Sequence, residues 1–173
     1  MLTILTAMLA LAAPVEDARD AIARAETEAK STGRAPSMGY WLIGPDNGWT
    51  SVSISVSTEL GAVGKPPRRA WTARRATSDG EKAVADSRAC PALTQALGTF
   101  DDLPAAAPRL PGNRLLDGEA RIVSSDTLYG LWSAGQRQPG GHFYSVRVEA
   151  SSGPYADWVI AAETTLAPCW RPA

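Results

Sequence analysis

Histidine and cysteine are scarce in this chain of 173 residues, which has one histidine, His142, and two cysteines, Cys90 and Cys169. A transition-metal site needs several imidazole, thiolate or carboxylate ligands that converge on one point, so this composition argues against one. His142 is also the only side chain whose ordinary pKa suits a general base near neutral pH. We therefore expect no bound metal and no other cofactor.

The sequence also lacks glycine-rich phosphate-binding motifs and an excess of charge of either sign. It contains no G-x-G-x-x-G, no P-loop and no G-x-S-x-G. Its 17 basic and 18 acidic residues give a net charge of −1, which provides no general attraction for nucleic acid. Any electrostatic recognition must therefore come from a local cluster of charges.

An uncharged, mostly apolar run extends from Leu2 to Ala13. It is shorter than the roughly 20 residues that cross a membrane, and its length is typical of the apolar region of a signal peptide. We expect cleavage after Ala12, which makes residues 1–12 the signal peptide and 13–173 a periplasmic or secreted domain without a transmembrane span. No Lys or Arg precedes the run, so a buried N-terminal helix is the alternative.

Cys90 stands immediately before Pro91, at the expected start of a helix, where a thiol can become acidic and reactive. In an exported protein two cysteines are expected to pair, and the single available intramolecular bridge is Cys90–Cys169. Closing a loop of 78 intervening residues would stabilise the fold by about 4 to 5 kcal/mol in the chain-entropy model. We therefore expect a structural disulfide rather than a nucleophilic Cys90.

Hydrophobic periodicity and turn residues predict alternating groups of helices and strands. Apolar residues at helical spacing predict three helices, over 15–31, 91–100 and 154–166. Alternating patterns predict a hairpin over 38–58 and further strands over 68–77, 120–126, 127–134 and 142–150. Residues 78–87 fit either a capped helix or another strand, and both remain open. We expect one α+β domain, in which two or three helices pack on a mainly antiparallel sheet with one disulfide.

A cluster of cations around Trp71 is the clearest candidate for a binding surface. Its members are Lys65, Arg68, Arg69, Arg74 and Arg75. On a strand, Arg69, Trp71 and Arg75 would share one face. The other two arginines would lie on the opposite face. The cluster could protect a solvated edge strand, or it could bind an anionic ligand such as a phosphate head group or an acidic polysaccharide.

The six tryptophans are the second feature that could indicate a binding surface. Exposed tryptophans can stack on sugar rings or anchor a partner protein, although most of these are expected in the core. Trp41, Trp49 and Trp71 are the candidates for exposure.

Two functions are compatible with these observations. We favour a non-catalytic binding or interaction module of the cell envelope, whose partner is an acidic envelope component or a protein. The alternative is a hydrolase of an envelope polymer, which would use His142 with a serine and an aspartate, or two carboxylates roughly 5 to 10 Å apart. Asp101 and Asp102 are adjacent in sequence and seldom would converge on one substrate atom, so we expect them to solvate a helix end.

Overall fold

The computed structural model describes residues 15–31, 34–59, 66–104, 127–134 and 145–173. The expected signal peptide, the strand expected at 120–126, Lys65 and His142 lie outside these ranges. The elements run in the order α1 (Val15–Ser31), β1 (Met38–Ile43), β2 (Trp49–Glu59), β3 (Arg68–Thr77), β4 (Lys82–Asp86), α2 (Pro91–Gly98), β5 (Leu128–Ala134), β6 (Ser145–Ala150), α3 (Pro154–Leu166), the 3-10 turn η2 (Ala167–Cys169) and β7 (Arg171–Pro172).

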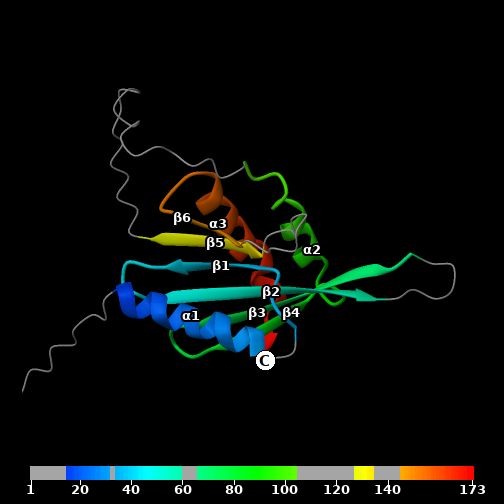
Figure 1. Cartoon of the computed structure of the whole chain (residues 1–173), viewed down its shortest axis with the longest axis horizontal. Coiled ribbons are helices and arrows are strands. Elements are labelled where there is room, and N and C mark those ends of the chain that lie inside the picture. Colours follow the sequence, from blue (N-terminus) through cyan, green and yellow to red (C-terminus); the bar gives the residue numbers. More distant parts are fainter. Residues whose placement is uncertain (1–14, 32–33, 60–65, 105–126, 135–144) are drawn as a thin grey trace, which may run out of the picture.

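These strands form one antiparallel sheet in the order β6-β5-β1-β2-β3-β4-β7. Helix α1 lies across one face of the sheet, and α2 and α3 cover the other (Figure 1). The expected α+β architecture is therefore confirmed, and the described residues form three helices and a single sheet. No helix in the described ranges is long and apolar enough to cross a membrane.

The ambiguous segment 78–87 is a tight turn followed by strand β4. Gly80 adopts a φ of 86°, a left-handed conformation that glycine reaches without steric cost. The side chain of Asp79 accepts hydrogen bonds from the Thr77 hydroxyl and the Glu81 backbone N–H. These two bonds lower the pKa of Asp79 below its ordinary value, because they favour its ionised form. The turn returns the chain antiparallel to β3.

Strand β1 is buried on both faces, because helices lie on both sides of the sheet. Tyr40 and Trp41 are neighbours in sequence, yet they are 0% and 1% exposed and face opposite layers. Tyr40 belongs to the larger core beneath α2 and α3, where its ring meets Trp158 edge to face at 5.7 Å. Trp41 belongs to a smaller core with Ile22 of α1.

Glycine and tryptophan alternate across the β1–β5 pair within the smaller core. Trp41 lies opposite Gly130, and Trp132 lies opposite Gly39. A Cβ atom at Gly39 would come within 2.7 Å of the Trp132 indole, and one at Gly130 would overlap the Trp41 indole. Each indole therefore lies over a strand position that has no side chain of its own.

Replacing Gly130 with alanine should lower the free energy of unfolding by about 1 to 3 kcal/mol, the usual cost of overpacking. Gly98→Ala is the matched control. Gly98 is the last residue of helix α2, and a Cβ atom added there would meet no atom within 4 Å. That substitution should leave stability unchanged or raise it by up to about 1 kcal/mol. Urea unfolding measures both, and equal effects at the two sites would contradict the tight contact at Gly130.

The disulfide joins Cys90 to Cys169, with a Cα–Cα distance of 5.7 Å across 79 sequence positions. Cys90 immediately precedes Pro91, the first residue of α2, and Cys169 ends the turn that follows α3. Cys169 is 5% exposed within the larger core. The structural assignment of Cys90 is confirmed, and the bridge fastens α2 to the end of α3.

The double variant Cys90→Ser/Cys169→Ser should lose up to about 4 to 5 kcal/mol of stability, because its unfolded chain regains loop entropy. For a domain of this size the melting temperature should fall by on the order of 10 °C. Calorimetry of the variant and of the reduced wild type measures the effect, and the two should agree. A melting temperature equal to that of the oxidised wild type would contradict the stabilising role.

Candidate binding surface on strands β2 and β3

Strands β2 and β3 extend beyond their neighbours in the sheet. β1 pairs with β2 over residues 49–54, and β4 pairs with β3 over residues 72–76. The β2–β3 pair itself continues to Glu59 opposite Arg68. Residues 55–59 and 68–71 therefore form a two-stranded ribbon that projects from the sheet (Figure 1). We refer to these residues as the ribbon.

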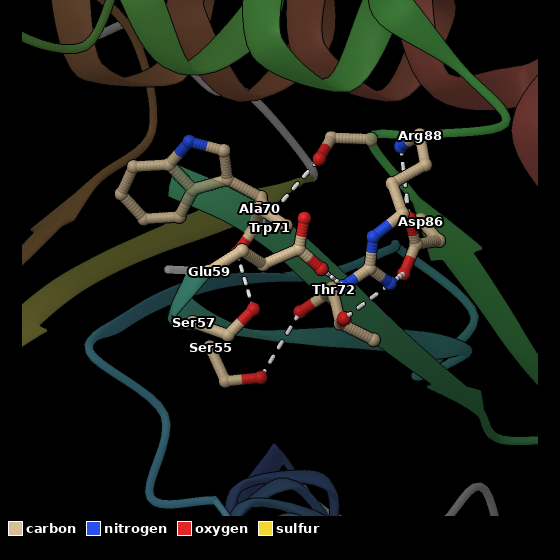
Figure 2. Close-up of polar contacts among 9 residues, drawn as sticks. Ser55, Ser57, Glu59, Ala70, Trp71, Thr72, Asp86 and Arg88 are labelled. Carbon is tan, nitrogen blue, oxygen red and sulfur yellow. Dashed lines mark hydrogen bonds and ion pairs between the residues drawn. The ribbon is translucent and has the colours of Figure 1, made fainter. Parts of the chain in front are cut away.

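Serine hydroxyls join the two strands of the ribbon on its α1 side. Ser57 donates to the carbonyl of Ala70 at 3.2 Å, and Ser55 donates to that of Thr72 at 3.4 Å (Figure 2). An isolated two-stranded hairpin is marginally stable in water, so cross-strand contacts of this kind matter here.

Trp71 anchors the other side of the ribbon. Its indole points toward α2 and α3, away from Ser55 and Ser57 (Figure 2), and packs against the larger core. Its backbone N–H donates to the Ser87 hydroxyl at 2.8 Å, and the Ser87 N–H donates to its carbonyl at 2.9 Å. The base of the ribbon is thus fixed by the indole in the larger core and by the hydrogen bonds to Ser87 beside β4.

Arg88 neutralises two carboxylates beside the ribbon. It pairs with Glu59, and with Asp86 at 3.1 Å. The hydrogen bond to Glu59 and the charge of Asp86 raise the pKa of Arg88 above its ordinary value. Thr72 also donates to Asp86 at 3.4 Å. These charged groups are therefore engaged with one another rather than directed at a partner.

The strand register divides the basic cluster between the two faces of the sheet, as the alternation predicts. Arg68 and Arg74 face the α1 side, whereas Arg69 and Arg75 face α2 and α3. The structure therefore does not gather the cluster into a single patch. Arg68, Arg69 and Arg74 are exposed, and none has an ion-pair partner among the described residues.

Arg75 differs from the other three arginines because it is committed to internal contacts. Its side chain is 19% exposed, pairs with Glu81 at 2.7 Å and lies 5.1 Å from the centre of the Trp170 ring. It also lies close enough to Tyr40 to act on that phenol electrostatically. Arg75 therefore connects β3 to Glu81 and to Trp170, which precedes β7, and is engaged in contacts within the fold.

The Tyr40 hydroxyl donates a hydrogen bond to the carboxylate of Glu163 in α3, at 2.8 Å. Burial raises the pKa of Tyr40 well above its ordinary value of 10.0. The charge of Glu163 and the hydrogen bond to it raise the pKa further, whereas Arg75 acts in the opposite direction. The phenol therefore stays protonated at neutral pH and serves as a structural donor.

The three tryptophans considered for exposure do not form an open platform. Trp41 is fully buried, because α1 covers its face of the sheet, so this candidate for exposure is excluded. Trp49 and Trp71 are half-buried, and each packs against one of the two cores. The sugar-stacking interpretation therefore finds no support in the described tryptophans of this group.

A cleft of about 60 Å³ lies between α1 and strands β2 to β4. Ser51 and Ser53 line it from the sheet, together with Arg74 of β3, and Glu28 and Lys82 pair beside it at 2.5 Å. Sequence reasoning identified Arg74 but missed the two serines. The alternation of serine and apolar residues in β2 was the available signal, but it does not indicate which serines α1 covers.

The groups considered for hydrolysis do not meet in the described structure. Asp101 and Asp102 are exposed in the turn after α2, and His142 lies outside the described ranges. Glu28 is the one carboxylate among the described side chains that line the cleft, and it is paired with Lys82. Within those ranges, no group of three or more histidine, cysteine or acidic residues is placed to hold a metal ion.

Comparisons with protein-family models, with curated proteins and with solved structures found no match for this chain. A functional assignment therefore depends on the chemistry of the ribbon and of the cleft.

Proposed function

We propose that the protein is a non-catalytic binding module of the cell envelope that holds an acidic envelope component through the ribbon. The observation that carries this proposal is the pair Arg68 and Arg69, which are exposed on the projecting strands without an ion-pair partner among the described residues. Glu59 lies directly opposite Arg68, but its carboxylate pairs with Arg88.

Two unpaired guanidinium groups suit recognition of carboxylates or phosphates, because each can donate two parallel hydrogen bonds to such a group. Arg68 and Arg69 point to opposite faces of a ribbon that is two strands wide. A flexible polyanion could therefore contact both by passing around the ribbon. Attraction between exposed charges is screened by salt, so this binding would be strongest at low ionic strength.

Two features support export to the envelope. The Cys90–Cys169 disulfide is of a kind that forms and persists in oxidising compartments. The uncharged run from Leu2 to Ala13 has the length of a signal-peptide apolar region.

The variant Arg68→Gln/Arg69→Gln should lower capture by immobilised polygalacturonate at low salt by roughly tenfold, because it loses two charge-assisted contacts. The control Arg24→Gln/Lys30→Gln removes the same charge from exposed positions of α1 and should retain capture. Affinity measured against salt concentration separates the two variants. Equal losses would attribute binding to net charge alone, and unchanged capture by the first variant would exclude the ribbon.

Protein recovered from the envelope fraction should begin at Ala13, since cleavage is expected after Ala12. Mass spectrometry of the intact chain measures the N-terminus directly. A chain in that fraction that retains Met1 would contradict the signal peptide.

A further inference from the structure

The cleft between α1 and the sheet is lined by two serine residues whose hydroxyl groups make no hydrogen bond within the described part of the chain. Ser51 and Ser53 are 3% and 5% exposed, and neither hydroxyl has a hydrogen-bond partner among the described residues. Ser55 and Ser57 continue the same row along β2, and each donates to a carbonyl of β3. The inner pair makes no such bond and is not among the fully buried polar atoms that lack a partner, so both hydroxyls are open to a molecule in the cleft.

Small side chains leave room for that ligand. Ala25 and Ala29 form the α1 wall of the cleft, and Ala76 lies beside Ser51 on the neighbouring strand. The volume of about 60 Å³ is roughly twice the share of one water molecule in the liquid. The cleft therefore has room for one compact polar group.

Among the charged side chains that line the cleft, Arg74 is the one cation without an ion-pair partner in the described residues. Arg74 lies directly opposite Ser53 in the β2–β3 register and has no ion-pair partner in the described part of the chain. Lys82 is paired with Glu28 at 2.5 Å. Arg171 is exposed on the same face, one strand beyond Val84. A singly charged anion matches this arrangement, whereas a dianion would place a second negative charge beside Glu28.

We propose that this cleft binds a single carboxylate group, which pairs with the guanidinium of Arg74 and accepts hydrogen bonds from Ser51 and Ser53. A carboxylate is planar and compact, and its two oxygens can accept from a guanidinium and from hydroxyl groups together. Arg74 lies outside the ribbon, so this site is independent of the proposed function.

The test is a titration of the full protein with acetate, followed by the amide resonances of β2 and β3. Wild type should show saturable shifts, and Arg74→Gln should weaken binding by about tenfold. Ser51→Ala/Ser53→Ala should also weaken it. Arg69→Gln is the matched control, because it removes the same charge from the opposite face of β3. Absence of saturable shifts in wild type, or an equal loss in Arg69→Gln, would overturn the proposal.

Variants of the Glu28–Lys82 pair distinguish an electrostatic effect on acetate binding from an effect of loosening α1. Both Glu28→Gln and Lys82→Gln break the same ion pair and release the same helix contact. Glu28→Gln should strengthen acetate binding, because it removes the neighbouring negative charge, and Lys82→Gln should weaken it. A change of the same sign in both would overturn the electrostatic assignment.

Two further measurements define the ligand class and distinguish the cleft from the ribbon as the binding site. Acetate should bind more tightly than inorganic phosphate, and the reverse order would overturn the carboxylate assignment. Arg68→Gln/Arg69→Gln should bind acetate like wild type. A loss of acetate binding in that variant would place the anion on the ribbon and overturn the cleft.

Discussion

The position of β1 between β2 and β5 determines both cores of the protein. Because successive strand residues face opposite sides, Tyr40 reaches α3 while Trp41 reaches α1. A shift of one residue in register would exchange them and would remove the Trp41 indole from its place over Gly130. The phenol of Tyr40 would also lose Glu163. Aromatic contacts on two faces therefore fix the alignment of the central strands.

Local sequence patterns predict most of the described elements, because each carries its own start and stop signals. The helices at 15–31 and 154–166 have the predicted bounds, and Pro168 follows the second of them. Residues 78–87 could not be decided locally, since it is pairing with β3 that makes residues 82–86 a strand. Strand order was also beyond local patterns, because β5 reaches β1 from a distant part of the sequence.

For the candidate surfaces too, local sequence patterns predict some features, whereas others depend on contacts between residues far apart in the sequence. Strand alternation predicts the separation of Arg68 and Arg74 from Arg69 and Arg75. The cleft is different, because it requires α1 to cross the sheet over Ser51 and Ser53. Sequence patterns identify both the helix and the strand but not their crossing point. The burial of Trp41 was missed for this reason.

Strand β7 illustrates how a very short element can affect the behaviour of the whole chain. Its two residues pair with Ala83 and Val84 and occupy the open edge of β4, and only Trp170 separates them from the disulfide-bonded Cys169. Pro172 has no N–H to donate, which suits an edge position. Reduction of the disulfide would free this strand and uncover backbone donors and acceptors of β4. Such an edge is a template for pairing with another chain, so the disulfide is one of the contacts that keep the β4 edge covered.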